Sequence, residues 1–156
     1  MWKTGSKNSI DFSDIITILS NVSKEKNHKV IIGSDSVKFG SLFIFANAIC
    51  IINDNKFYDR RYFYSRSKFK NNTYYNLYDR LLKETSDSIM IASLIKEKLD
   101  NINIEIHLDI NSDSNHRSFK YKNLLVGYVK GSGFSCKIKP DSFVASGLAD
   151  VHTRKS

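Results

Sequence analysis

The chain has 156 residues, of which 24 are Lys or Arg and 16 are Asp or Glu, so its formal net charge is +8. This length suits a single domain, and a hydrophobic content of 41% excludes a globally disordered chain. No apolar run approaches the ~20 residues that a membrane helix needs, so we expect no membrane partner. The two cysteines, Cys50 and Cys136, cannot form a disulfide scaffold and suit a reducing, cytoplasmic location. The positive charge favours an anionic partner, and nucleic acid is the first candidate.

The N-terminal half of the chain predicts one helix followed by three strands. Apolar residues at helical spacing predict a short amphipathic helix over Asp11–Lys26. A β-branched run predicts a buried strand over Lys29–Ser34, and longer apolar stretches predict strands over Ser41–Asn53 and Lys56–Ser65. Turn residues between the last two strands predict a hairpin, and three consecutive strands predict antiparallel pairing.

The C-terminal half alternates between helices and strands. The stretch Asn72–Asp100 lacks Gly and Pro and predicts one long helix, which is followed by a strand over Asn103–Ile110. A helix over Ser118–Val129, a short strand over Phe134–Ile138 and a last helix over 140–153 complete the order. Strand–helix–strand units favour parallel crossovers, so we expect an α/β fold with a mixed sheet covered by helices. We expect one domain over residues 1–156, with residues 1–27 as an N-terminal helical extension.

Three acidic residues interrupt apolar patterns at places where a catalytic site is expected. Asp35 and Asp109 each end a predicted strand, and ligands of open α/β sheets bind at the carboxyl ends of strands. Glu84 falls on the apolar stripe of the long helix, where a carboxylate is costly unless it is paired or bound to a metal. Other interpretations remain open: Asp35 also suits a turn, and Glu84 also suits the edge of the stripe.

The fourth acid of such a cluster is either Asp150 or Asp141. Nine residues separate them, which is about 2.5 helical turns, so both cannot face one site from the same helix. Asp141 follows Pro140 and suits a helix cap, whereas small residues surround Asp150 and allow close packing on the sheet. We therefore favour Asp150. Oxygen ligands of this kind suit Mg²⁺ or Mn²⁺, and two such ions can hold the attacking and leaving oxygens of a phosphodiester.

The order of these four acids is similar to that of the ribonuclease-H-like nuclease fold, and several segments resemble the bacterial YkuK-type family of that fold. The resemblance spans roughly residues 10–153, and its most specific parts are the HLDIN and KPD stretches. The segments that carry it are Ile32–Ser36, Glu105–Asn111, Val126–Phe134, Lys139–Asp141 and Ala149–Asp150.

This resemblance implies a five-stranded mixed sheet, with strands 1–3 antiparallel, flanked by helices. It implies a divalent-metal acid cluster and hydrolysis that leaves 5′-phosphate and 3′-hydroxyl ends, but it does not single out RNA, DNA, hybrid or structured nucleic acid as the substrate. Proofreading exonucleases of this fold carry an acid two residues after the first Asp, and Val37 at this position disfavours that class. Ribonuclease H proper has Asp-Gly after the first strand, where this chain has Asp35-Ser36.

Two histidines and a basic segment complete the candidates. His116 lies in a polar loop after Asp109 and suits a proton shuttle or a solvent-exposed loop. His152 follows Asp150 closely but points elsewhere on a regular helix. Aromatic rings interleave with cations between residues 57 and 80, which favours contact with phosphates and unpaired bases, although alternate rings of a strand must face the core. The candidate nucleic-acid-binding residues are Arg60, Arg61, Arg66, Lys68, Lys70 and Lys139.

The sequence therefore predicts a metal-dependent nuclease of ribonuclease-H-like fold. The alternative is a module of the same fold that binds nucleic acid without cutting it. A protein-interaction domain is the third class, in which the charge is incidental.

Overall fold

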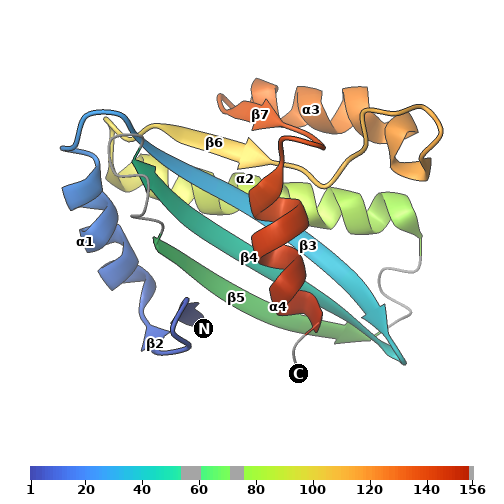
Figure 1. Cartoon of the computed structure of the whole chain (residues 1–156), viewed down its shortest axis with the longest axis horizontal. Coiled ribbons are helices and arrows are strands. Elements are labelled where there is room, and N and C mark those ends of the chain that lie inside the picture. The colour runs from blue at the N-terminus through green and yellow to red at the C-terminus, as the bar shows by residue number, and fades with distance from the viewer. Residues whose placement is uncertain (54–60, 71–75, 155–156) are drawn as a thin grey trace.

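The computed structural model describes residues 1–53, 61–70 and 76–154. They form an α/β fold in which one mixed β-sheet has helices on both faces (Figure 1). The described strands are β1 (Trp2–Thr4), β2 (Ser9–Ile10), β3 (His28–Phe39), β4 (Leu42–Asn53), β5 (Arg61–Lys70), β6 (Ile104–His107) and β7 (Ser135–Lys137). The described helices are α1 (Phe12–Val22), α2 (Leu77–Lys98), the 3₁₀-helix η1 (Arg117–Tyr121), α3 (Lys122–Gly131), the π-helix η2 (Val144–Ala149) and α4 (Asp150–Arg154).

The sheet has seven strands in the part of the chain that the structure describes, in the order β2-β1-β5-β4-β3-β6-β7. Neighbours among β3, β4 and β5 pair antiparallel, whereas β6 pairs parallel to β3 and β7 parallel to β6. The expectation of five strands is therefore wrong, because an N-terminal hairpin adds β1 and β2 at the edge of β5. The N-terminal extension is thus a hairpin followed by a helix. Strands of two and three residues are too short for a hydrophobic period to reveal them.

Each face of the sheet packs against a different set of helices. Figure 1 shows α2 behind β3 and β4, with η2 and α4 crossing in front of them. Along β3, Val30 and Ile32 join the larger core with α1 and α2, whereas Ile31 joins a smaller cluster that contains Val144 and Ala149 of η2. Because both faces of the strand are covered, its sequence is a continuous apolar run instead of an alternating one.

Several predicted boundaries differ from the structure. The strand expected over 29–34 is observed over His28–Phe39, and the strand expected over 103–110 is observed over Ile104–His107. The strand expected over 56–65 is observed over Arg61–Lys70, so Arg66 belongs to the strand and not to a connection. The helix expected over 118–129 is split into η1 and α3. The last helix does not begin at Pro140: residues 139–140 form a turn, and a bend at Asp141 precedes the helical turns of η2. Residues 54–60 and 71–75, where we expected the hairpin turn and the start of the long helix, lie outside the described residues.

At Gly33 a helix lies so close to the sheet that no side chain fits between them. A Cβ atom at this position would lie 2.6 Å from the backbone nitrogen of Ala145 and 2.9 Å from the carbonyl carbon of Val144. Both atoms belong to the backbone of η2, so a side chain at position 33 must push this helix away from β3.

We predict that Gly33→Ala destabilises the protein by about 1–3 kcal/mol, because overpacking against backbone cannot relax by a rotamer change. Chemical denaturation measures this loss as a lower midpoint. Gly127→Ala is the matched control, since nothing lies within 4 Å of a Cβ there and alanine favours the helix α3. Equal midpoints for the two variants would contradict the packing described.

Candidate acidic active site

Parallel pairing of β3 with β6 brings Asp35 and Asp109 to the same level of the sheet. In this ladder Gly33 pairs with His107, the last residue of β6, and each aspartate follows two residues later. β3 does not end at Asp35, as we expected, but continues to Phe39. The two carboxylates therefore meet at one corner of the sheet, beyond the end of β6 and beside the continuing strand β3.

Glu84 reaches the same corner from α2. Its side chain is buried, and its Oε1 accepts a hydrogen bond of 2.7 Å from the Ser36 hydroxyl. Arg80, one turn earlier on α2, donates to Ser36 through Nε at 3.2 Å and to the Ser36 carbonyl through Nη2 at 2.9 Å. Ser88 and Ser34 form a second tie at 2.8 Å. Small polar residues thus hold α2 close to β3 and direct Glu84 towards the site.

Asp150 comes from the opposite face, at the start of α4. It is hydrogen-bonded to Asp35, and its Oδ1 lies 3.2 Å from Nη2 of Arg154. Asp141, the other candidate for the fourth acid, is exposed in the turn before η2, where its N–H donates to the carbonyl of Ile138. The structure brings Asp150, and not Asp141, to Asp35.

The four acids Asp35, Glu84, Asp109 and Asp150 are here called the acid cluster, and within it the pKa values of Asp35 and Glu84 are raised. Burial, and then the charges of Glu84 and Asp109, raises the pKa of Asp35 to about 9. Hydrogen bonding to Asp150 and Asp109 acts in the same direction. Burial also raises the pKa of Glu84 to about 8, against the opposing hydrogen bond from Ser36 and with a contribution from Asp109. Asp35 and Glu84 therefore carry protons at neutral pH unless a cation compensates their charge.

Cations surround this cluster in a pocket of about 360 Å³. Asp35, Glu84 and Asp109 line it together with a rim of cations and polar side chains that includes His116. Lys139 Nζ lies 2.7 Å from Asp109 Oδ1, an ion pair whose angles do not make a hydrogen bond. The rim residues that carry or can acquire positive charge are Arg80, His116, Arg117 and Lys139. Such a pocket suits an anionic ligand that binds together with a cation: the acids would contact the cation, and the rim residues would contact the anion.

Several of these residues were not expected from the sequence. Ser36 and Arg80 hold Glu84 in place by hydrogen bonds between β3 and α2, and Arg117 lies in η1. No local sequence pattern therefore marks these residues as neighbours of the acid cluster. His116, a secondary candidate, lines the pocket and is exposed. The only signal that could have identified Arg117 is its position directly after His116 in the polar loop.

His152, the other secondary candidate, does not line this pocket. Its ring stacks on Tyr64, with centroids 3.6 Å apart and planes 8° from parallel, and its Nε2 lies 3.2 Å from the Tyr62 hydroxyl. His107 is also structural: its Nδ1 accepts from the Val144 N–H at 3.3 Å, so its Nε2 carries the proton that Glu105 accepts. Burial lowers the pKa of His107, which keeps this ring neutral.

The candidate nucleic-acid-binding residues are distributed along β5. Arg66 shares a cross-strand row with Asp35 through Ala46, so both lie on the same face of the sheet. Lys68 and Lys70 continue this face at alternate positions and are exposed. Arg61 is exposed at the start of the strand, Lys139 lies in the pocket, and Arg60 lies outside the described residues.

The acid cluster has the ligand type of a metal site but not yet its arrangement. Among the described residues, no three His, Cys, Asp or Glu side chains are already arranged as ligands around a metal ion. Instead, individual oxygens point to partners within the chain, as Asp109 does to Lys139 and Asp150 to Arg154. The donor set nevertheless fits a hard divalent cation, because it consists of carboxylate oxygens only, and because burial and neighbouring acids raise the pKa of Asp35 and Glu84 while no cation is bound.

The fold and the position of the acids define a class of α/β proteins with a mixed sheet and an acidic corner between β3, β6 and α2. The family model described as Ribonuclease H-like matches residues 12–154 of this chain. The chain therefore belongs to the Ribonuclease H-like family, and the resemblance to its YkuK-type bacterial group is confirmed. No curated protein and no solved structure matches the chain. In the described part of the chain, no helix combines the length and apolar character that crossing a bilayer requires.

We predict that Asp35→Asn stabilises the metal-free protein at pH 8. A folded state with raised carboxyl pKa values binds protons more tightly than the unfolded chain. The wild-type protein therefore loses stability as pH rises from about 4, where unfolded carboxyls titrate, to about 9. Removing one of the acids should recover on the order of 1–3 kcal/mol, which thermal unfolding in EDTA at pH 5 and pH 8 measures.

Asp100→Asn, at an exposed site beyond α2, is the control for this experiment. A wild-type midpoint that stays constant or rises between pH 5 and pH 8 would contradict the predicted repulsion within the cluster.

Proposed function

We propose that this protein is a divalent-metal-dependent nuclease that hydrolyses phosphodiester bonds. The observation that carries the proposal is the convergence of the acid cluster from β3, α2, the end of β6 and α4. Membership of the Ribonuclease H-like family, which includes nucleases, supports it. The cationic rim supports it further, since phosphodiesters are anions.

In this proposal the acid cluster would hold Mg²⁺ or Mn²⁺, and its four carboxylates could serve as ligands for two such ions. Bound ions of this kind activate water and stabilise the charge that develops on the attacking and leaving oxygens. The four carboxylates would hold and orient these cations. No side chain needs to act as the nucleophile.

The rim residues would bind and orient the substrate. Lys139 and Arg117 offer charged donors to the non-bridging oxygens of a phosphate that enters the pocket. Arg80 keeps Ser36 and, through it, Glu84 in position. His116, exposed at the rim, is placed to carry a proton between the pocket and solvent.

We predict that Asp109→Asn and Asp150→Asn each lower the rate of metal-dependent cleavage by about 10²-fold or more, because each removes a ligand charge. Asp141→Asn is the matched control and should retain wild-type activity. The measurement is cleavage of end-labelled RNA, DNA and RNA–DNA hybrid with Mg²⁺, with Mn²⁺ and in EDTA. Equal residual activity of wild-type protein and Asp109→Asn on all three substrates would contradict the proposal.

A second function, nucleic-acid binding without cleavage, is favoured by one observation. Lys139 and Arg154 already pair with Asp109 and Asp150, so part of the cluster's charge is balanced within the chain. In that case the acids would have a structural role and the exposed cations of β5 would carry the function.

This second function predicts binding that persists in EDTA and in Asp35→Asn, and that weakens steeply with salt. Fluorescence anisotropy of a labelled oligonucleotide, at salt concentrations of roughly 50 to 300 mM, measures this change in affinity. Cleavage by wild-type protein that Asp109→Asn abolishes would contradict a function restricted to binding.

A further inference from the structure

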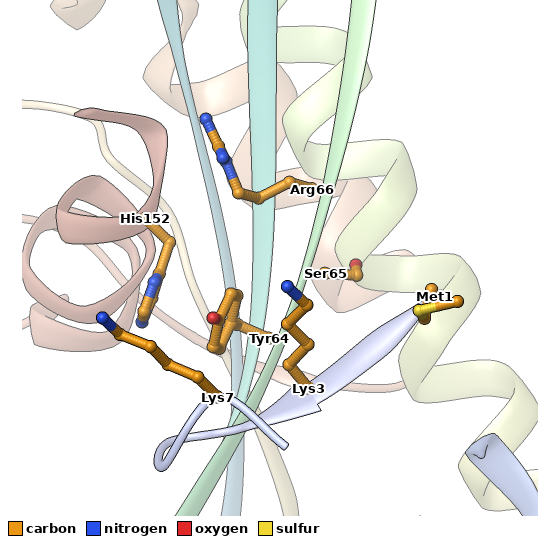
Figure 2. A pocket seen from close by; sticks show the side chains of 7 residues that line it. All are labelled: Met1, Lys3, Lys7, Tyr64, Ser65, Arg66 and His152. Atoms are coloured by element: carbon orange, nitrogen blue, oxygen red, sulfur yellow. The ribbon is translucent and has the colours of Figure 1, made fainter. Parts of the chain in front are cut away.

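A second pocket lies on the same sheet face as Asp35, at the junction of β1, β5 and α4. Its volume is about 330 Å³. Figure 2 shows Lys3, Lys7, Tyr64, Arg66 and His152 arranged around one space, with His152 entering from α4 and Lys3 and Lys7 from the N-terminal hairpin. These five residues are called the basic pocket below.

Arg66 is the residue whose situation most requires a ligand. Its Nε and Nη2 are buried and have no hydrogen-bond partner among the residues that the structure describes. Buried guanidinium donors without partners cost free energy that an anion can recover, and the partly exposed Arg66 guanidinium matches the geometry of a phosphate. Figure 2 shows the guanidinium extending away from β5 and over β4.

The two lysines add to this unbalanced charge. Lys3 pairs with Tyr64 in the β1–β5 ladder, which fixes its backbone beside the pocket. Lys7 lies in the tight turn of the hairpin, with its N–H bonded to the Thr4 carbonyl at 2.8 Å. Within the described part of the chain, neither Lys3, Lys7 nor Arg66 forms an ion pair with a carboxylate. Three cations therefore face one space without a balancing acid.

One wall of the pocket is rigid and aromatic. Tyr64 and His152 stack with centroids 3.6 Å apart, and the Tyr62 hydroxyl lies 3.2 Å from His152 Nε2. Burial raises the pKa of Tyr62, so its hydroxyl stays neutral and adds no negative charge. This wall ties α4, which carries Asp150, to β5, which carries Arg66, and so links the pocket physically to the acid cluster.

The register of the sheet sets the separation between the pocket and the acid cluster. Asp35 pairs with Ala46, and Ala46 pairs with Arg66, so two strand spacings, or ~10 Å, separate the Asp35 and Arg66 backbones. Ala46, between them, is buried against Val144 and Ala149 of η2, so η2 separates the two sites on this face of the sheet. Lys68 and Lys70 continue the positive charge along the same face.

We propose that the basic pocket binds a phosphate group of a nucleic-acid strand, separate from the phosphate that lies at the acid cluster. The proposal rests on the proposed function for its choice of nucleic acid over other phosphate-bearing ligands. The phosphate oxygens accept from the guanidinium of Arg66, and Lys3 and Lys7 neutralise the remaining charge. The phosphate is either internal to the strand or at its end, and the experiment below separates the two.

The experiment measures binding of a labelled single-stranded oligonucleotide of roughly 12 nucleotides by fluorescence anisotropy in EDTA, where no metal-dependent cleavage occurs. Arg66→Gln and, separately, Lys3→Gln should each weaken binding by about 10-fold and reduce the slope of log affinity against log salt by about 0.7, the value for one phosphate contact on a single strand. The matched control is Lys98→Gln, an exposed cation in the last turn of α2. It should change neither quantity.

Oligonucleotides with a 5′-phosphate, a 3′-phosphate or two hydroxyl ends form the three arms. Equal losses in all arms mean that the pocket takes an internal phosphate. A phosphate at one end that strengthens wild-type binding, but not binding by Arg66→Gln, means that the pocket takes a terminal phosphate. Either result supports the proposal. Affinities and slopes of Arg66→Gln and Lys3→Gln that equal those of Lys98→Gln would overturn it.

The exposed position of Lys3 keeps the test valid if Arg66→Gln does not fold. Failure of the pocket and failure of the nuclease proposal give different results. A wild-type protein that never cleaves but loses affinity on Lys3→Gln keeps the pocket and refutes the nuclease. A wild-type protein that cleaves, with Arg66→Gln and Lys3→Gln binding normally, does the reverse.

Discussion

The close contact between η2 and β3 at Gly33 is the constraint on which the acidic corner depends. Backbone atoms at Val144 and Ala145 occupy the space that any side chain at position 33 would need. Since Asp150 directly follows η2, this contact determines how near α4 comes to Asp35. The parallel ladder of β3 with β6 adds Asp109 at the same level, and the serine contacts of α2 add Glu84. The acids of β3, α2, α4 and the end of β6 therefore meet at one corner, because Gly33 has no side chain that would keep η2 and α4 away from β3.

Electrostatics gives this corner its chemical character. A chain with a net charge of +8 nevertheless buries Asp35 and Glu84 beside two further acids, at the expense of holding protons on them at neutral pH. Cations lie around the cluster, and more lie on the same sheet face at Arg66, Lys68 and Lys70. A negative centre within a positive surround attracts an anionic polymer and requires a small cation at the point of closest approach. Net charge alone predicts only the first of these two properties.

The sequence predicts the parts of this arrangement that depend on local patterns. Acids that follow apolar strands identify Asp35 and Asp109, and an acid on an apolar helical stripe identifies Glu84. Parts that depend on register or on remote contacts could not be predicted in this way. The short strands β1 and β2 leave no period, and the five-residue shift of β5 moves Arg66 into the sheet. Only the pairing through Ala46 shows that Arg66 and Asp35 share a face.

A crystal structure of the protein grown with Mn²⁺ tests most directly whether the acid cluster is a divalent-cation site. Anomalous scattering locates manganese without reference to activity. We expect an anomalous peak within coordination distance of carboxylate oxygens of Asp35 and Asp109, with Lys139 displaced from Asp109. Manganese bound only at exposed acids such as Asp141, with the Lys139–Asp109 ion pair still intact, would contradict it.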